Sequence, residues 1–588
     1  MRCEGCFPAI CSCLERGLLS HCRPQFGGRH RRMVGRHVIM RPAAASRAPR
    51  NHCLLTAVLW LCTITLFAAT PVVADSPANQ QSAIKTGRQL EVKRRWADAL
   101  THYQTASEQW PDTKEIQHGL RRSRIQCGIQ HRYADRSFRQ QLLTIPERQA
   151  MSLFDDLVAR VQSSFVEPVS LTSFVAHGTE SLYLSLANQK FLDRHLPAGS
   201  TPTADRVLQL RSTLFKSYWN RQIRSSAEAH RVVTEVCRIS QRILGLPASS
   251  VALEYVFGGC NALDDYSACL TPDRYSDLNA NIDGQFVGLG VEIKAKPGHG
   301  LLLMDVLPAS PAETAGLRPG DHVVRIDGTD CRDMSTDEAA SLLKGPIGSR
   351  VQLGFRRAKL SGEQRLQVIR RPVIVKSIPL TTMLDNKQHI GYIQMTGFQR
   401  STANELDSAL ATLQQQGVRA VIWDLRHNPG GLLDAATDVL DRFIADGVLV
   451  STRGRSFDQN RVYRAHRRGT NDLKLVVLTD GESASASEIV AGAIRDHHRG
   501  LVIGRRTYGK WSVQSIFPLA KSSGLRLTTA KFYSPAGHNL SKVGVRPDID
   551  VAAPKTQDGV YRRPTRESLS TDADVRKALE ELRARLAG

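Results

Sequence analysis

The stretch D-G-E-S-A-S-A-S-E-I-V-A-G-A-I-R-D at residues 480–496 decides the fold of the second half of this chain. It follows the apolar run L-V-V-L (475–478), and its own apolar residues recur at helical spacing. The pattern predicts a buried strand that leads into a helix over 483–497. Strand and helix alternate around it from about 390 to 504, with further helices at 402–416 and 432–445. Such alternation indicates an α/β layer fold with parallel strands.

Two other motifs accompany this stretch. V-I-G-R-R-T-Y-G-K-W-S-V-Q occupies 502–514, and D-L-R-H-N-P-G-G occupies 424–431. Together the three motifs resemble those of the carboxyl-terminal processing peptidases, serine peptidases with a PDZ domain ahead of an α/β core. The resemblance extends from about Ile145 to Val551 and implies a crotonase/ClpP-like layered core over 373–552.

The resemblance also implies a catalytic site. Ser485 takes the place of the nucleophile, Lys510 that of the general base, and Gln514 that of the glutamine that positions the lysine. A small residue usually follows the lysine in this family, whereas Trp511 follows it here. We expect this indole to wall the substrate cleft.

The implied residues make chemical sense. A serine hydroxyl needs an adjacent base, and burial lets a lysine act as one because it disfavours the ammonium. At the start of the helix, the Ala486 N–H is placed for a developing oxyanion, with a second N–H from Gly430 or Gly431. The sequence leaves these two glycines as alternatives. Ser483, expected to cap the helix, and Ser487 are the local rivals of Ser485.

Three charged residues are interpreted as structural support. Glu488 shares a helix face with Ser485 and could cap the helix start or hold an arginine. Asp496 lies on the same face and matches an acidic residue of the family. Arg426 is expected to brace the glycine turn by ion pairing.

A β-rich segment over 283–372 precedes the core. F-V-G-L-G-V-E-I (286–293) and P-A-E-T-A-G-L-R-P-G-D (311–321) resemble the motifs of a PDZ domain. Consecutive amides in such a loop form an anion-binding nest, and the strand edge beside it can accept a peptide. We therefore expect a substrate C-terminal carboxylate to bind at Gly288, Leu289, Gly290 and Val291. The alternative is a PDZ domain that serves only as a structural gate.

Helical patterns dominate the region before the PDZ domain. Small and large residues at Gly87, Leu90, Ala99, Tyr103, Ala106 and Pro111 fit one tetratricopeptide repeat within 75–140. A generic helical hairpin is the alternative. Residues 141–282 predict a helical N-terminal part of the peptidase, and 553–588 a charged C-terminal tail.

The N-terminus resembles an export signal with extra sequence in front. Residues 1–52 hold ten Arg and two Glu, and 53–74 carry no charge. This pattern predicts a signal peptide cleaved after Ala74 or an uncleaved anchor, with translation starting at Met33 or Met40. Either way the bulk of the chain lies outside the cytoplasm, in the periplasm or an equivalent compartment.

Composition excludes several classes of protein. Part of the net charge of +23 lies in the leader. The sequence contains no basic run with interleaved aromatic residues, which is the pattern that would indicate nucleic-acid binding. No Asp/Glu/His cluster has metal-ligand spacing, so no metal or organic cofactor is expected. Downstream of the leader only Cys127, Cys237, Cys260, Cys269 and Cys331 remain. They are interpreted as free thiols, with one Cys260–Cys269 bridge as the alternative.

The sequence therefore predicts an exported serine endopeptidase that recognises substrate C-termini through its PDZ domain and cleaves with a Ser485/Lys510 dyad. Its expected partners are protein or peptide substrates, and an adaptor or substrate at the tetratricopeptide-like region. Two alternatives remain. One is an inactive scaffold that works through its PDZ and helical domains, and the other is a binder of apolar ligands on the same fold.

Overall fold

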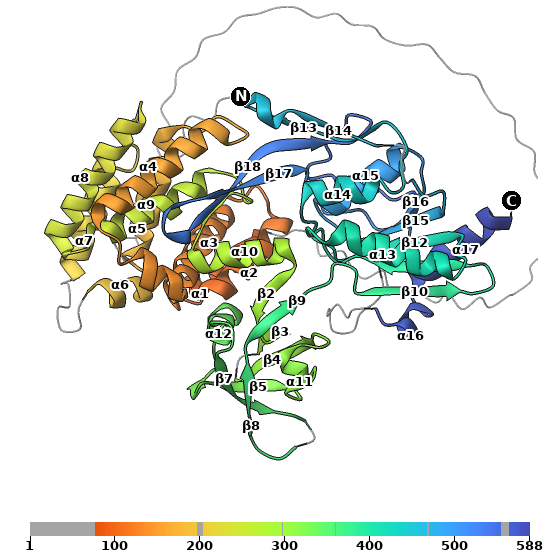
Figure 1. Cartoon of the computed structure of the whole chain (residues 1–588). Helices are drawn as coiled ribbons and strands as arrows, with labels where there is room; N and C mark the ends of the chain where they lie inside the picture. The colour runs from red at the N-terminus through yellow and green to blue at the C-terminus, as the bar shows by residue number, and fades with distance from the viewer. Residues whose placement is uncertain are drawn as a thin grey trace, which may run out of the picture. The chain divides into compact units, whose positions relative to one another are not determined.

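The computed structural model describes residues 77–196, 204–296, 298–358, 360–466, 470–553 and 564–587 (Figure 1). The expected leader (1–52) and the expected signal or anchor (53–74) lie outside these residues. Among the helices of the described part, none is long and apolar enough to cross a bilayer.

Three antiparallel helices begin the described chain. The ring of Tyr103 fills the space beside Gly87 and Gly119, because a Cβ added at either glycine would lie 2.3 or 2.2 Å from the ring. The expected helix pair is therefore present, and its assignment to the tetratricopeptide class stays a prediction. The helices are α1 (Pro77–Val92), α2 (Trp96–Gln109) and α3 (Lys114–Ala134).

A helical bundle follows. Its centre is α9, in which the residues from Ser249 to Val256 are all buried, and α4, α5 and α8 pack around it. The bundle comprises η1 (Phe138–Leu142), α4 (Glu147–Ser164), α5 (Leu171–Ser185), α6 (Gln189–His195), α7 (Ala204–Ser217), α8 (Ser226–Leu244), α9 (Ala248–Gly259) and η2 (Cys260–Ala262). Next, β1 (Ala268–Leu270) and α10 (Pro272–Asp283) lead to the PDZ domain.

The PDZ domain has its own hydrophobic core. A two-stranded ribbon, β2 (Gln285–Gly288) and β9 (Arg371–Ile374), connects it to the rest of the chain. Its sheet has the order β3-β4-β5-β7-β8, with β6 paired to β5. The elements are β3 (Val291–Lys296), β4 (Gly300–Val306), α11 (Pro311–Thr314), β5 (His322–Ile326), β6 (Thr329–Asp330), α12 (Thr336–Leu343), β7 (Arg350–Arg356) and β8 (Gln364–Ile369).

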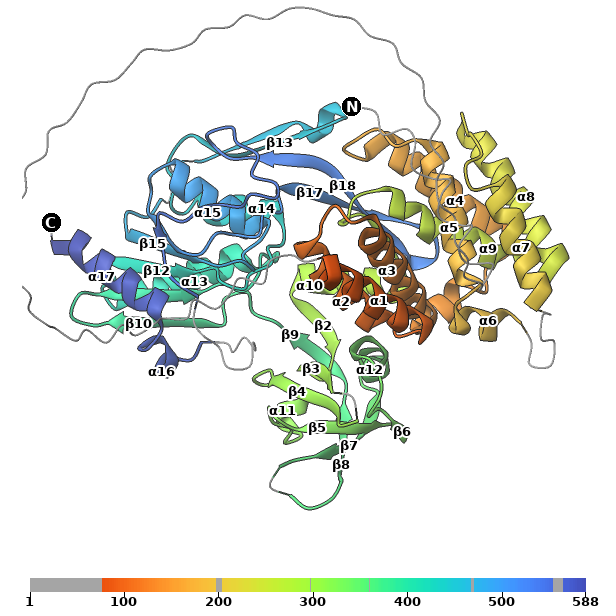
Figure 2. The same cartoon turned by 180° about the vertical axis from the view of Figure 1, so that it is seen from behind.

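The peptidase core is built on a sheet of order β10-β11-β12-β15-β16-β19, which is parallel except at β10 (Figure 2). Alternate residues of each central strand face opposite sides, so Trp423 packs with α13, α14 and α15 while Ile422 faces the other side. The elements are β10 (Leu380–Asp385), β11 (Ile390–Gln394), α13 (Thr402–Gln415), β12 (Ala420–Asp424), α14 (Leu433–Leu440), β15 (Lys474–Thr479), α15 (Ala486–Asp496), β16 (Leu501–Gly504) and β19 (Ile549–Asp550).

The expectation of a charged tail over 553–588 is wrong for its last part. The helix α17 (Ala573–Ala587), preceded by α16 (Arg566–Leu569), packs on β12, β15 and β16. Its buried residues Val575, Ala578 and Leu582 cover the second face of the sheet. A parallel sheet needs both faces covered, which explains why this charged segment is folded.

A second sheet joins the core to the helical bundle. Its long strand β18 (Gly524–Tyr533) pairs with β13 (Val448–Gly454) in the core, with β1 beside the bundle, and with β17 (Ser512–Pro518). The strand β14 (Arg461–Arg464) pairs with β13, and the short helices η3 (Phe457–Gln459) and η4 (Ala520–Ser522) lie in the connections. Lys510 lies just before β17.

Candidate active site

Ser485 lies in a tight turn between β15 and α15, immediately before the helix begins. Its φ of 57° and ψ of −112° are in a region that L residues rarely adopt, and the Ser487 N–H closes the turn on the Ala484 carbonyl at 3.1 Å. Such a conformation costs about 1–3 kcal/mol, and strained residues of this kind cluster at functional sites. The expectation that Ser483 caps the helix is wrong, because Ser485 occupies the cap position.

The two rival serines have structural roles. Both are fully buried. The Ser483 hydroxyl donates to the Leu425 carbonyl at 2.8 Å, and the Ser487 hydroxyl donates to the Asn428 carbonyl at 2.9 Å. Both bonds hold the turn after β15 against the glycine-containing turn after β12.

That glycine turn touches the serine directly. A Cβ added to Gly430 would lie 2.8 Å from both Ala486 N and Ser485 Cβ. The Gly430 N–H is already used, since it donates to Asn428 Oδ1 at 2.9 Å. Within the ranges that the structure describes, the N–H groups of Gly431 and Ala486 have no hydrogen-bond partner. This difference favours Gly431 over Gly430 as the second oxyanion donor.

Glu488 is the centre of the site's hydrogen bonding. Its carboxylate is fully buried. It accepts the backbone N–H groups of Ser485 at 2.9 Å, Gly509 at 2.7 Å and Lys510 at 2.8 Å. The Thr507 hydroxyl at 2.6 Å and Trp511 Nε1 at 3.3 Å donate to it as well. One carboxylate therefore anchors the backbones of both implied catalytic residues.

The structure does not support the expectation that Trp511 walls a cleft. The indole is 1% exposed and belongs to the core around α15. It lies edge-on to the ring of Phe532, with centroids 6.4 Å apart, and a Cβ added to Gly492 would lie 3.2 Å from it. Its apolar ring is buried while its N–H binds Glu488, so it acts as internal support.

The Lys510 side chain is half-buried and lies against an aromatic ring. Its Nζ is 5.0 Å from the centroid of the Tyr266 ring, and between these two described residues no hydrogen bond joins Lys510 Nζ to Ser485 Oγ. Burial lowers the pKa of Lys510, and the nearby Arg526 guanidinium lowers it further. Both effects disfavour the ammonium and move the group towards the neutral form that a base requires.

The side-chain hydrogen bonds of Gln514 go to residues other than the lysine. Its amide nitrogen donates to Ser512 Oγ at 2.9 Å and to Thr528 Oγ1 at 3.2 Å. Gln514 is close to Lys510 in sequence, as the family pattern requires. Its side chain, however, forms its hydrogen bonds along β17 and β18.

Arg426 forms ion pairs as expected, with additional partners. It contacts Asp424 at 2.7 Å, and also Asp572 at 2.9 Å and Asp574 at 2.6 Å, at the start of α17. It thus fixes the C-terminal helix to the end of β12.

Asp496 accepts the Ala536 N–H at 3.1 Å and pairs with Arg495 at 3.2 Å, which is a structural role.

The PDZ loop presents free backbone amides. In the described residues, the N–H groups of Leu289 and Gly290 have no hydrogen-bond partner, whereas their carbonyls accept the N–H groups of Ala312 and Leu307 at 2.9 Å. Gly290 has a φ of 77°, and a Cβ there would lie 2.3 Å from Ser310 Cβ. Only glycine fits this close approach, so the loop geometry depends on it.

The described residues contain neither a metal-ligating cluster nor a disulfide. Among the described residues, no group of three His, Cys, Asp or Glu side chains could hold a metal ion. The cysteines of this part, all buried, are free thiols, and the Cys260–Cys269 bridge is not formed.

Sequence reasoning missed Tyr266 and Tyr508. Tyr266 lies in D-D-Y-S (264–267), far from the catalytic motifs in sequence, and only the pairing of β1 with β18 brings it to Lys510. Tyr508 is two residues before the lysine, and burial together with the nearby Tyr508 raises the pKa of Tyr266 to about 12. In the sequence, only the T-Y-G-K motif, which contains Tyr508, indicates a tyrosine near the lysine.

Comparisons with known proteins agree with the motifs. Residues 389–551 match the model of peptidase family S41, and 303–357 match that of the PDZ domain. A carboxyl-terminal-processing protease of Synechocystis sp. is 35% identical over 295 residues, which are 50% of this chain and 68% of that protein. A carboxy-terminal-processing protease of Bartonella bacilliformis is 34% identical over 325 residues, 54% of this chain and 73% of that protein.

A solved structure, the photosystem II D1 C-terminal processing protease, is 26% identical with a TM-score of 0.37, over 68% of this chain and 93% of that chain. The sequence identity to the Synechocystis and Bartonella proteases, and the share of each that is covered, confirm the family resemblance seen in the motifs. The chain therefore belongs to the carboxyl-terminal-processing proteases of peptidase family S41, and it is a PDZ-containing serine peptidase.

Proposed function

We propose that this peptidase cleaves peptide bonds with Ser485 as nucleophile and Lys510 as general base. The observation that carries the assignment is the Glu488 carboxylate, which accepts the backbone N–H groups of both residues at 2.9 and 2.8 Å. A buried carboxylate with several donors is fixed in place, so the two backbones are held at a constant separation.

The proposed reaction follows from these groups. Ser485 Oγ attacks the substrate carbonyl carbon while its proton passes to Lys510 Nζ, and the carbonyl oxygen becomes an oxyanion. The free N–H groups of Ala486 and Gly431 stabilise that charge, and each such donor is worth about 10²–10³ in turnover. The lysine then protonates the leaving amine. Water, deprotonated by the same lysine, hydrolyses the acyl-enzyme and restores Ser485.

A fluorophosphonate probe, which reacts with activated serines, tests this assignment. We expect it to label the wild type and the Ser487→Ala variant, but neither Ser485→Ala nor Lys510→Arg. Arginine retains its charge and cannot act as a base. Labelling of Ser485→Ala at the wild-type rate would show that another serine is the nucleophile.

The PDZ loop is proposed to bind the substrate's C-terminal carboxylate. The supporting observation is the pair of free N–H groups at Leu289 and Gly290, next to the edge strand β3. Amides that converge on one point favour an anion, and an edge strand can pair with a peptide. Substrates with an amidated C-terminus should bind and turn over more weakly. Equal cleavage of both forms would favour a purely structural PDZ domain.

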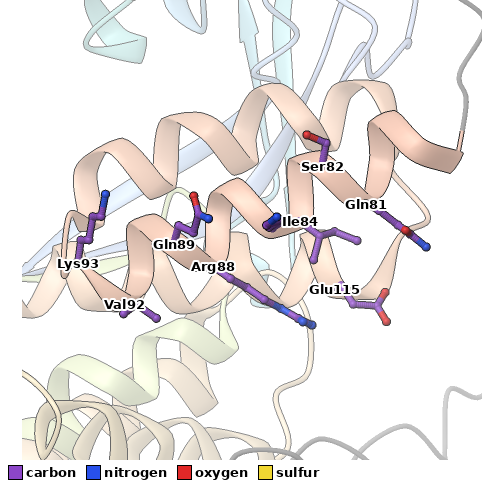
Figure 3. A pocket seen from close by; sticks show the side chains of 9 residues that line it. Gln81, Ser82, Ile84, Arg88, Gln89, Val92, Lys93 and Glu115 are labelled. Carbon is purple, nitrogen blue, oxygen red and sulfur yellow. The ribbon is translucent and has the colours of Figure 1, made fainter. Parts of the chain in front are cut away.

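The tetratricopeptide-like region is proposed to bind an acidic segment of a partner or substrate. A groove of about 1070 Å³ runs along α1, and Glu115 at the start of α3 lines it as well (Figure 3). Its exposed cations Lys85, Arg88 and Lys93 form no ion pair with any other described residue, and one carboxylate, Glu115, also lines the groove. The excess of positive charge favours an Asp/Glu-rich ligand.

Charge reversal tests this surface. Arg88→Glu should weaken the binding of a polyglutamate peptide, measured by calorimetry at low salt. Arg139→Glu makes the same change at an exposed position outside the groove and serves as the control. Equal loss in both variants would indicate a general charge effect and contradict a defined site.

The protein is also proposed to be exported, on the strength of the uncharged segment 53–74 behind an Arg-rich leader. A periplasmic or equivalent compartment follows, with the protein either released or retained by that segment. Fractionation of cells and N-terminal sequencing of the mature protein distinguish cleavage after Ala74 from an uncleaved anchor.

A further inference from the structure

The side chain of Lys510 is held by an aromatic residue from outside the core sheet. Its Nζ lies 5.0 Å from the centroid of the Tyr266 ring. Tyr266 belongs to the connection between η2 and β1, which is part of the helical bundle in sequence. The lysine therefore meets a group that neither catalytic motif supplies.

Tyr266 and the residue after it are fixed by hydrogen bonds to β18. The Tyr266 carbonyl accepts Arg526 Nε at 2.9 Å. The next residue, Ser267, accepts the Thr528 N–H at 3.0 Å through its hydroxyl. Because β18 anchors both Tyr266 and Ser267, the ring has a defined position beside the lysine.

The groups around Lys510 act on its protonation in opposite directions. The face of an aromatic ring attracts an ammonium but not a neutral amine. Burial and the Arg526 guanidinium disfavour the ammonium, while the carboxylates of Asp264 and Glu488 favour it. The groups facing Lys510 are thus Arg526 on β18, Asp264 before β1, Glu488 on α15, and the ring of Tyr266.

We propose that Tyr266 is a positioning residue that holds Lys510 in a charged resting position, from which the lysine must move to reach Ser485. The proposal rests on Lys510 being the base of the proposed function. The supporting geometry is the 5.0 Å contact of Lys510 Nζ with the ring, together with the lack of a hydrogen bond from this described lysine to Ser485 Oγ. Tyr266 thereby opposes the neutral form that the attack step needs.

The test compares Tyr266→Leu with Tyr266→Phe. Leucine keeps an apolar side chain without the ring, whereas phenylalanine keeps the ring without the hydroxyl. We expect Tyr266→Leu to move the acid limb of the pH profile of kcat/KM to lower pH by about half a unit. The free energy of a cation–π contact corresponds to a pKa shift of about that size. Tyr266→Phe should leave the acid limb in place.

A direct titration separates this proposal from the proposed function. In protein with ε-¹³C-labelled lysine, the Lys510 signal is the one that disappears in Lys510→Arg. Its titration should shift in Tyr266→Leu even if the protein cleaves no test peptide, in which case only the assignment of the base fails. An unchanged titration in Tyr266→Leu overturns the positioning role, whatever the protease activity.

A milder variant covers the case in which Tyr266→Leu does not fold. Tyr266→Met also removes the ring, but its unbranched, flexible side chain can fill the same space with less disturbance of the packing. We expect the Lys510 titration to shift in the same direction as in Tyr266→Leu. No shift of the Lys510 titration in Tyr266→Met, with Tyr266→Leu unfolded, also overturns the proposal.

Discussion

The carboxylate of Glu488 accepts the backbone N–H of Ser485 at 2.9 Å and thereby holds the strained turn that presents the serine. The contact is fully buried, so water cannot replace the carboxylate. Because the same carboxylate also accepts the N–H groups of the segment around Lys510, a change at Glu488 affects both halves of the site at once.

Glu488→Gln should therefore cost both stability and activity. A glutamine side chain places an NH₂ group where donors already point, so at least one charged hydrogen bond is lost. We expect a loss of about 2–3 kcal/mol in the free energy of unfolding and roughly 10²-fold in kcat/KM. Denaturant titration and peptide hydrolysis measure the two effects. Glu482→Gln changes an exposed carboxylate in the same turn and should alter neither quantity.

Trp511→Gly should unfold or loosen the core rather than widen substrate preference. Removing a fully buried indole leaves a cavity, which costs about 3–5 kcal/mol. Trp511→Phe keeps an aromatic ring and loses the N–H donated to Glu488, so it should cost less. Thermal denaturation ranks the variants, and the sites of cleavage in an unfolded substrate should be the same for Trp511→Phe and the wild type. A changed cleavage pattern in Trp511→Phe would indicate that the indole lines the substrate cleft.

Ser485→Gly should be more stable than Ser485→Ala, although both variants lose catalysis. The φ of 57° at this residue strains any side chain with a Cβ, and glycine adopts it freely. We expect the glycine variant to exceed the alanine variant by about 1 kcal/mol in denaturant unfolding. A more stable alanine variant would mean that the turn relaxes and stores no strain.

The sequence predicted the order of strands and helices in the core because periodicity and the glycine turns are local signals. It also predicted the neighbouring positions of Ser485, Ala486 and the glycine turn, since the ends of adjacent parallel strands meet at one edge of the sheet. The sequence does not distinguish Gly431 from Gly430. The preference depends on the side chain of Asn428, which occupies only the Gly430 N–H.

The failures have a common physical cause. Trp511 was placed in the cleft because it follows the lysine in sequence, yet side chains alternate across a strand-like segment and this one faces the core. The charge of the C-terminal segment predicts a tail, while the second face of the sheet that this segment covers is visible only in the fold. Tyr266 likewise reaches Lys510 only through the long-range pairing of β1 with β18.

Gly290→Ala should weaken recognition of substrate C-termini. Gly290 has a φ of 77°, and the added Cβ would meet Ser310 Cβ at 2.3 Å, so the loop must move away from α11. Gly298→Ala is the matched control, because Gly298 has the same φ of 77° in the same domain but open space around it. Binding of a fluorescent free-acid peptide should fall for Gly290→Ala beyond any change in Gly298→Ala. Equal affinities in the two variants would argue against the loop as the carboxylate site.

Lys510→Met should stabilise the protein at neutral pH and abolish hydrolysis. Burial lowers the pKa of Lys510 in the folded state below its unfolded value of about 10.4. Between these two pKa values the unfolded chain binds more protons, so the wild type becomes more stable as the pH rises through this window. The stability advantage of Lys510→Met should therefore be largest below the folded pKa and shrink towards pH 10. Denaturant unfolding from pH 6 to 10 measures it, with Lys521→Met as an exposed control that should show no such trend. A constant difference between Lys510→Met and the wild type across this range would mean that the pKa of Lys510 is unshifted, and the lysine would then have to act as a base by another means.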